Sequence, residues 1–278
     1  MPTIAFLLVI LAAALHALWN FLTKKTAGDL ATIWNGMVMV CIVFTPFMFF
    51  LAPEVVAFSK VYPHIIASGV IHAFYFFYLA KAYEHGEISV VYPIARGTGI
   101  AGTAIAASLL LRENISLPGT SGIIVVCTGI FLLGYKNGRH KHGIKFALVV
   151  GVMIVSYSIV DKLAVGISHP LFYIYGCTVL FTLLLAPHVM IRKRRELSEA
   201  WKSRKKYSIT IGLGSVSTYL IILFVFRIAQ VSYVVAAREF AVAIGAILGF
   251  IFLKEKLTIR KAIGIAAIVA GMILIKMA

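Results

Sequence analysis

The segment LRENISLPGTSG at residues 111–122 recurs as LKEKLTIRKAIG at residues 253–264. Sliding the chain on itself by about 142 residues produces this match and also places Arg96 on Arg238. Two copies of one unit indicate an internal duplication, which is common among membrane transporters. The repeated segment therefore predicts a fold built from two related halves.

The composition excludes a soluble globular protein. Of the 278 residues, 61% are hydrophobic and 13% are charged, and the mean hydropathy is +0.98, whereas soluble domains are about half apolar and about a quarter charged. The apolar residues form continuous blocks of about twenty, the length of a helix that crosses roughly 30 Å of hydrocarbon. A membrane β-barrel would show short alternating stretches instead. We therefore predict an all-α integral membrane protein.

Charged residues and Gly/Pro clusters divide the chain into about ten predicted transmembrane helices. These lie at residues 3–23, 30–52, 64–83, 88–111, 117–135, 144–166, 169–191, 208–228, 231–253 and 259–277. Because an odd number of helices per copy turns the second copy over, we predict two inverted five-helix repeats, residues 1–137 and 138–278, in one membrane domain. The charged connector at residues 192–207 is expected in solvent or among lipid headgroups.

The charge distribution predicts the orientation. A net charge of +16 suggests nucleic-acid binding in a soluble chain, but most of the 26 Lys and Arg lie in connectors on one side of the predicted helices. By the positive-inside rule that side is cytoplasmic, so both termini are expected outside and no nucleic-acid partner is expected. The first apolar block has no basic region before it, unlike a signal peptide, and we keep it as a span. We predict the plasma (inner) membrane as the location.

The duplicated connector, with the glycines that follow it in each half, resembles the EamA repeat of the drug/metabolite transporter superfamily. These glycines are Gly122, Gly129, Gly264 and Gly271. The resemblance covers nearly the whole chain and implies a ten-helix secondary transporter, with helices 1–4 and 6–9 around a central cavity and helices 5 and 10 outside it. The segments HALWN at residues 16–20 and YPIARG at residues 92–97 are similar to those of a subgroup associated with phosphonate-utilisation permeases. Outward termini differ from the topology of well-studied relatives and leave the direction of transport open.

Two arginines lie inside predicted helices. Arg96 and Arg238 are each about seven or eight residues into a span, roughly 10 to 12 Å deep at 1.5 Å per residue. A guanidinium stays protonated, and its donors match carboxylate, phosphate or phosphonate oxygens. The pair therefore predicts a central anion site. The alternative is that each arginine is permanently paired with an acid and holds helices together; the candidate acids are Glu84, Glu87, Glu239 and Asp161.

Glu239 and Asp161 are predicted intramembrane carboxylates that could bind a substrate amine or carry a coupling proton. Glu239 follows Arg238 directly, so on a continuous helix their side chains point about 100° apart and do not share a face. The alternative role of Glu239 is an interhelical salt bridge.

Asp161 aligns within one residue of Asn20 in the other half. Tyr157 precedes Asp161 by one turn, and His16 precedes Asn20 by one turn. This spacing predicts a polar stripe on each helix that faces protein. The alternative is that Asp161 caps a helix end or forms a pair there.

Polar aromatic residues and histidines complete the predicted substrate site. Tyr92 shares a helical face with Arg96. Other aromatic side chains could line a ligand, or alternatively serve packing and the membrane interface. They are Trp19, His72, Tyr75, Tyr157 and Tyr219. His16 and His72 are also candidate proton relays, and the alternative is a neutral histidine that is hydrogen-bonded between helices.

Motifs of other protein classes are missing from the sequence. It contains no GxxxxGK, HExxH or GxSxG motif and no Cys/His cluster, so we predict no enzymatic activity, no cofactor and no metal. Glu113 and Glu255 are interpreted as structural, each capping or bracing the next helix.

We interpret the chain as a secondary transporter that moves a small polar metabolite, such as an amino acid, carboxylate or phosphonate, by alternating access. The proton is one candidate coupling ion. The alternatives are an exporter of amphipathic or cationic compounds and a translocase for lipids or lipid-linked sugars. The oligomeric state is left open.

Overall fold

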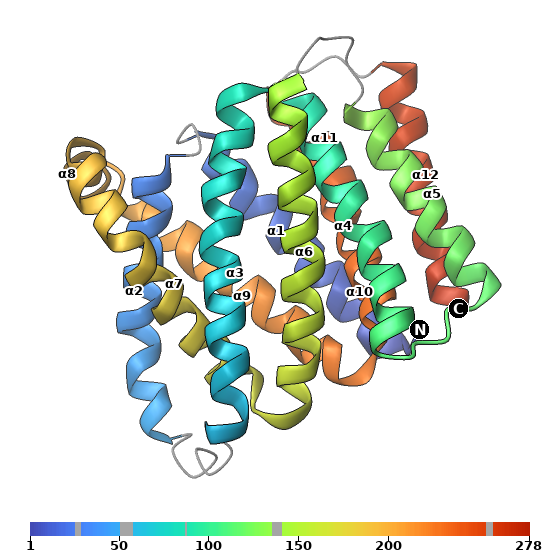
Figure 1. Ribbon diagram of the computed structural model, residues 1–278. Helices are drawn as coiled ribbons and strands as arrows, with labels where there is room; N and C mark the ends of the chain where they lie inside the picture. The colour runs from blue at the N-terminus through green and yellow to red at the C-terminus, as the bar shows by residue number, and fades with distance from the viewer. Residues whose placement is uncertain (26–28, 51–57, 87, 135–140, 254–257) are drawn as a thin grey trace. The chain divides into compact units, whose positions relative to one another are not determined.

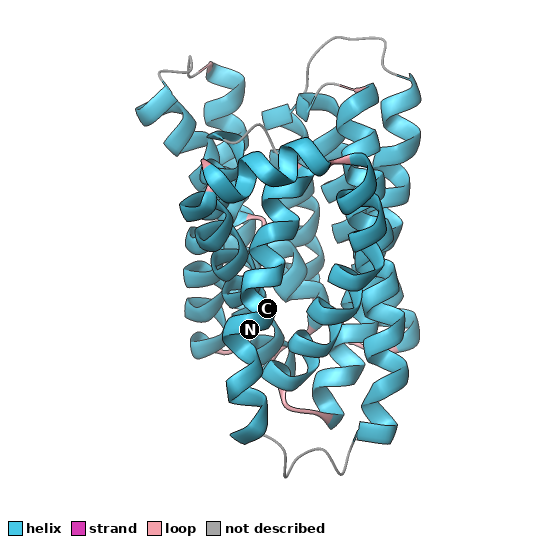
Figure 2. Ribbon diagram, turned by 90° about the vertical axis from the view of Figure 1, so that its left-hand side faces the viewer, coloured by secondary structure: helices cyan, strands magenta, loops and turns pink. Residues whose placement is uncertain are grey.

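The computed structural model describes residues 1–25, 29–50, 58–86, 88–134, 141–253 and 258–278 (Figure 1). These residues form helices joined by loops (Figure 2). The helices are α1 (Thr3–Lys25), α2 (Leu30–Phe50), α3 (Phe58–His85), α4 (Ile88–Leu110), α5 (Leu117–Gly134), α6 (Lys141–Ile167), α7 (Pro170–Arg192), α8 (Arg194–Lys202), α9 (Lys205–Ile228), α10 (Val231–Arg238), α11 (Phe240–Leu253) and α12 (Ile259–Met277).

The predicted all-helical membrane fold is confirmed. Within the described residues, seven segments are long and apolar enough to cross a membrane. One of them, Val231–Phe252, includes both α10 and α11. Most of the predicted boundaries agree with the helices to within a few residues; the span predicted at 169–191, for example, is α7 at Pro170–Arg192.

The connector at residues 192–207 contains a helix that was not predicted. In α8, Glu196 lies in the first turn and Lys202 in the last, which suits the helix dipole at both ends. Ala200 is buried, while Arg194 and Arg195 are exposed. The segment is too short and too charged to cross a membrane, so only its amphipathic pattern could have indicated a helix.

The ninth predicted span is broken in the middle. Helix α10 ends at Arg238 and α11 begins at Phe240. At the junction, the N–H of Glu239 donates to the carbonyl oxygen of Ala236 at 3.1 Å, a tighter turn than that of an α-helix. Irregular backbone at membrane depth is tolerated where protein buries it, and Arg238 and Glu239 are both buried.

One compact unit of the chain comprises Met1–Ala14, Phe74–Ile159 and Ile228–Ala278. In it, α5 and α12 approach so closely that only glycine fits at the contacts. A Cβ on Gly122 would lie 2.8 Å from the carbonyl oxygen of Gly271, and a Cβ on Gly129 would lie 2.7 Å from that of Gly264. Small residues allow such backbone contact between membrane helices. The glycines of the duplicated motif therefore hold the fifth and tenth spans together.

The connector after α4 caps α10 in the same unit. The Glu113 carboxylate accepts hydrogen bonds from the N–H of Val231 at 2.6 Å, the N–H of Ser232 at 3.2 Å and the Ser232 hydroxyl at 2.6 Å. The predicted capping role of Glu113 is confirmed, but the capped helix belongs to the other half and is not the next helix along the chain. Glu87 and Glu255 lie outside the described residues.

The other compact unit comprises Leu15–Ala73 and Val160–Arg227. Here α2 and α9 touch at glycines, since a Cβ on Gly36 would lie 3.0 Å from the backbone nitrogen of Gly212. The indole N–H of Trp34 on α2 donates to the carbonyl oxygen of Thr182 on α7 at 2.9 Å. Each compact unit thus contains segments from both predicted halves.

Candidate functional site

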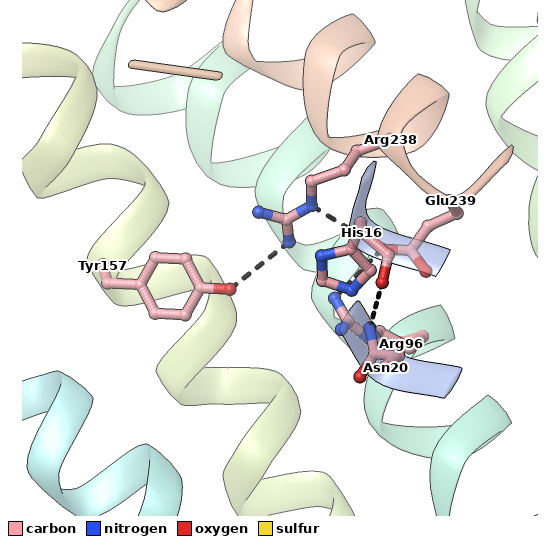
Figure 3. Close-up of polar contacts among 6 residues, drawn as sticks. All are labelled: His16, Asn20, Arg96, Tyr157, Arg238 and Glu239. Atoms are coloured by element: carbon pink, nitrogen blue, oxygen red, sulfur yellow. Dashed lines mark hydrogen bonds and ion pairs between the residues drawn. The ribbon is translucent and has the colours of Figure 1, made fainter. Parts of the chain in front are cut away.

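Four of the predicted site residues meet in the first compact unit (Figure 3). Arg96 lies on α4, Tyr157 on α6, and Arg238 and Glu239 lie at the break between α10 and α11. All four are buried, with exposed fractions of 8% for Arg96, 4% for Tyr157, 5% for Arg238 and 3% for Glu239. Because burying an uncompensated charge is expensive, the pairing of these charges determines what the cluster can bind.

Arg96 and Glu239 form a buried ion pair. The Nη1 atom of Arg96 donates to Oε1 of Glu239 at 3.1 Å. Removing one partner of such a pair costs about 3–5 kcal/mol, whereas exposed pairs contribute about 0–1 kcal/mol. Glu84, another candidate partner, instead lies 3.4 Å from Lys81 in an exposed pair. Arg96 thus has an acid partner, as required by the alternative in which the arginine is permanently paired and holds helices together.

Arg238 shares the same carboxylate. Its Nη2 atom donates to the Tyr157 hydroxyl at 3.3 Å, and its Nε atom lies 3.9 Å from Oε1 of Glu239. The expectation that Arg238 and Glu239 point apart was wrong, because it assumed a continuous helix. The break at Glu239 brings the two side chains of neighbouring residues together (Figure 3).

Two further tyrosine rings contact members of the cluster. The guanidinium carbon of Arg96 lies 5.2 Å from the centroid of the Tyr92 ring, within cation–π range. Tyr75 packs edge-to-face on Tyr157, with ring centroids 5.8 Å apart. The predicted proximity of Tyr92 to Arg96 is confirmed. The Tyr92 face that could receive a cationic ligand is occupied by the protein's own guanidinium.

The formal charges of this cluster favour an anion. Two guanidinium groups share one carboxylate, so Arg96, Arg238 and Glu239 together carry one positive charge. Arginine donors fit the oxygens of carboxylates and phosphonates. Across the described part of the chain, no group of three or more His, Cys, Asp or Glu is placed to hold a metal ion.

Asp161 belongs to a separate polar cluster in the second unit. Its carboxylate accepts hydrogen bonds from the hydroxyls of Ser68 and Tyr173, each at 2.6 Å, and from the hydroxyl of Tyr219. His72 lies next to this group, with its ring centroid 5.9 Å from that of Tyr219. Asp161 lies inside α6, so the predicted alternative of a helix cap was wrong.

His16, Trp19 and Asn20 lie on α1 in the second unit and interact locally. The Asn20 amide donates to the carbonyl oxygen of His16 at 2.9 Å, and the His16 ring packs edge-on against Trp19 at 4.8 Å. Asn20 is exposed, and the prediction that this stripe faces protein stays a prediction. The Asn20 side-chain amide is hydrogen-bonded within its own helix, to the preceding turn.

Two residues of the Asp161 cluster were not predicted from the sequence. Ser68 precedes His72 by one helical turn, and that spacing was the available signal. Tyr173 follows Asp161 by twelve residues and sits on the next helix, so no local pattern connects the two.

Comparison with known proteins identifies the family. The EamA-like transporter family model matches residues 3–135 and again residues 141–277. The chain belongs to the EamA-like transporter family. It is accordingly a multi-pass membrane transporter and not an enzyme, and a transporter of this kind implies a small-molecule substrate.

The chain is also similar to two individual proteins. The quaternary ammonium compound-resistance protein QacH of Staphylococcus saprophyticus is 30% identical over 83 residues, which are 30% of this chain and 77% of that protein. The crystal structure of another protein superposes on this chain with a TM-score of 0.79 at 15% identity, covering 99% of this chain and 96% of the other. At that identity the likeness concerns the fold alone.

Proposed function

We propose that this EamA-family chain is a secondary transporter for a small polar metabolite that bears an anionic group, and that Arg96 and Arg238 bind that group. The observation that carries the proposal is the buried cluster in which two guanidiniums share the Glu239 carboxylate. A buried net positive charge is costly and is relieved by an anion. Amino acids, carboxylates and phosphonates all supply such a group.

In this proposal Glu239 holds the arginines while the site is empty of substrate. An incoming carboxylate or phosphonate would compete with Oε1 of Glu239 for the donors of Arg96, which now lie 3.1 Å from it. If the substrate also carries an ammonium group, the released Glu239 carboxylate would receive it. Exchange of one ion pair for another avoids an unpaired buried charge during binding.

The wider setting of the proposal follows from the sequence. The repeats at residues 1–137 and 138–278 would be the two halves that alternate access, in the plasma (inner) membrane, with both termini outside. Phosphonates are included because of the HALWN and YPIARG segments at residues 16–20 and 92–97.

A second candidate is export of quaternary ammonium cations. The similarity to QacH over 83 residues favours it, as do the packed rings of Tyr75 and Tyr157. Against it, the cluster is positively charged and Arg96 already covers Tyr92. The two candidates therefore require ligands of opposite charge.

A thermal-stability screen of the detergent-purified protein separates them, because a ligand that binds only the folded state raises the midpoint. The probes are glycine, lactate, methylphosphonate and tetramethylammonium, applied to wild type, Arg96→Ala, Arg238→Ala and, as a control, Arg227→Ala, an exposed arginine. Stabilisation by an anion or zwitterion that is lost with Arg96 or Arg238, and kept in the control, supports the anion site. Stabilisation by tetramethylammonium alone, unchanged in every variant, would overturn it.

A further inference from the structure

The second compact unit contains a buried carboxylate that has no role in the proposed anion site. Asp161 on α6 has no exposed surface. Three helices supply hydroxyl groups to it: Ser68 from α3 and Tyr173 from α7 donate to Oδ1, and Tyr219 from α9 donates to Oδ2. An ionisable group held inside a membrane helix is a functional candidate because its burial is costly.

Hydroxyl groups stabilise an ionised carboxylate without neutralising it, since each supplies one hydrogen and no formal charge. Lys162, the neighbour of Asp161 on α6, donates to the carbonyl oxygen of Phe226. The titratable groups that face Asp161 come from the three packed helices. They are His72 on α3 through Ser68, Tyr173 and Cys177 on α7, and Tyr219 on α9.

A proton fits this arrangement better than a metal ion does. The Ser68 and Tyr173 oxygens each lie 2.6 Å from Oδ1 of Asp161, and their hydrogens occupy the space between. Mg²⁺ and Ca²⁺ are bound by several carboxylate, carbonyl or water oxygens, whereas this cluster offers one carboxylate and three neutral hydroxyls that already donate to it. A proton needs no added space, because one hydroxyl rotates and accepts from the protonated carboxyl.

A hydrogen-bonded chain leads from Asp161 to a less buried group. The Nδ1 atom of His72 lies 3.1 Å from the Ser68 hydroxyl and 2.9 Å from the Ser68 carbonyl oxygen. His72 is half-buried, whereas Ser68 and Asp161 are fully buried. Histidine exchanges protons near neutral pH. A proton can pass from Nδ1 of His72 to the Ser68 hydroxyl oxygen while the Ser68 hydrogen passes to Oδ1 of Asp161. One N–H bond and one O–H bond break, two O–H bonds form, and Ser68 stays neutral.

We propose that Asp161 is a reversible proton-binding site that is reached through His72 and Ser68. Proton binding stands on the geometry of this cluster alone. Its use as the coupling step of transport rests on the proposed function, so the two parts require separate tests.

Infrared difference spectra of the purified full-length protein, recorded between alkaline and acidic buffer, test proton binding without any substrate. Acidification of wild type is expected to produce the C=O stretch of a buried carboxylic acid with a matching loss of carboxylate absorption. Asp161→Asn should lose this signal, while Glu239→Gln and the exposed-site control Glu84→Gln should keep it. A wild type without the signal, or an Asp161→Asn variant that retains it, would overturn the proposal.

The route is tested by the rate of the same signal after a rapid pH jump. His72→Gln should slow its appearance by about tenfold or more, because a proton relay is lost, and should leave its final amplitude unchanged. His64→Gln is the matched control, since His64 lies on the same helix and contacts the carbonyl oxygen of Lys60. An unchanged rate in His72→Gln would exclude the His72 route.

Coupling is tested in proteoliposomes with whichever of glycine, lactate or methylphosphonate stabilises the protein. Asp161→Asn should retain exchange of internal for external substrate and lose accumulation driven by a pH gradient. Accumulation at the wild-type rate would show that Asp161 binds a proton without coupling it. If none of the probes binds, the proposed function fails while the infrared result still decides the proton site.

Discussion

The Glu113 carboxylate and the Ser232 hydroxyl lie 2.6 Å apart, and the same carboxylate accepts the N–H groups of Val231 and Ser232. Glu113 belongs to the duplicated motif of the first half, and Ser232 to the first turn of α10 in the second half. The first N–H groups of a helix have no partner within it, and a negative charge there also suits the helix dipole. The acid of the motif thus secures the helix that ends in Arg238.

Glu113→Gln should therefore destabilise the protein. Glutamine keeps one acceptor oxygen but loses the charge, and a lost charged cap costs about 1–3 kcal/mol. We expect the thermal midpoint of the detergent-purified protein to fall by a few degrees. The exposed carboxylate of Glu84 provides the control, and Glu84→Gln should leave the midpoint unchanged. Equal midpoints for the two variants would refute the capping role.

Gly129→Ala should destabilise the contact between α5 and α12. The new Cβ would lie 2.7 Å from the backbone carbonyl oxygen of Gly264, which has no freedom to rotate away. Overpacking of this kind costs about 1–3 kcal/mol, and a lower thermal midpoint would report it.

The matched control for this prediction is Gly166→Ala on α6. A Cβ on Gly166 would meet nothing within 4 Å, and alanine is favoured over glycine inside a helix by roughly 0.5–1 kcal/mol. The control should leave the midpoint unchanged or raise it. Equal thermal midpoints for Gly129→Ala and Gly166→Ala would contradict the close packing of α5 against α12.

Much of the fold was predictable because it depends on apolar length and on the repeat. The glycines at 122, 129, 264 and 271 could be found by self-alignment, and they form the α5–α12 contact. The break at Glu239 could not be found, because hydropathy does not distinguish one span from two consecutive short helices. Nor could the partner of Glu113 be found, since it lies on a helix more than a hundred residues away.

The residues of the site were easier to predict than their pairing. An arginine inside an apolar block is conspicuous, so Arg96, Arg238 and Glu239 could all be named. The pairing of acids with arginines depends on the local backbone at Glu239. Helical periodicity assumed a continuous helix there and so predicted that pairing wrongly. Likewise Tyr157 and Asp161, one turn apart on α6, contact different groups: Arg238 for the first and Ser68, Tyr173 and Tyr219 for the second.

A double-mutant cycle should reveal strong coupling between Arg96 and Glu239. Arg96→Met and Glu239→Gln each break a buried pair, at about 3–5 kcal/mol. The double variant leaves neither of these charges behind and should cost clearly less than the sum of the single changes. Thermal midpoints of the four proteins measure this. Additive losses would mean that the ion pair contributes little in the membrane.

Glu239→Gln should also change ligand preference. Removing the carboxylate raises the charge of the cluster from one to two and removes the competitor for the donors of Arg96. Stabilisation by lactate or methylphosphonate should therefore increase. Stabilisation by glycine should increase less or fall, because its ammonium loses a partner. An equal response to all three probes would place their binding site elsewhere.

Helix α8 provides a test against a lipid-translocating function. Its exposed residues include Arg194, Arg195 and Lys202, and Trp201 is 47% exposed with the Lys205 ammonium 4.7 Å from its ring centroid. A basic helix with an exposed tryptophan suits the anionic membrane surface. Each basic residue near that surface contributes about 1 kcal/mol. Changing the three basic residues to glutamine should therefore weaken the affinity for phosphatidylglycerol about a hundredfold, measured as the lipid concentration needed to raise the thermal midpoint.

The acidic residues of α8 supply the opposite control. The Glu196 carboxylate accepts hydrogen bonds from its own backbone N–H and, at 3.1 Å, from the Lys193 ammonium. Both bonds lower the pKa of Glu196, so this carboxylate is ionised at neutral pH. Glu196→Gln with Glu199→Gln should then strengthen the response to phosphatidylglycerol and leave that to phosphatidylcholine unchanged. A metabolite transporter should still exchange its substrate after the three basic residues are neutralised, because none of them belongs to the buried cluster. Loss of exchange would instead favour a translocase that collects lipid headgroups at α8.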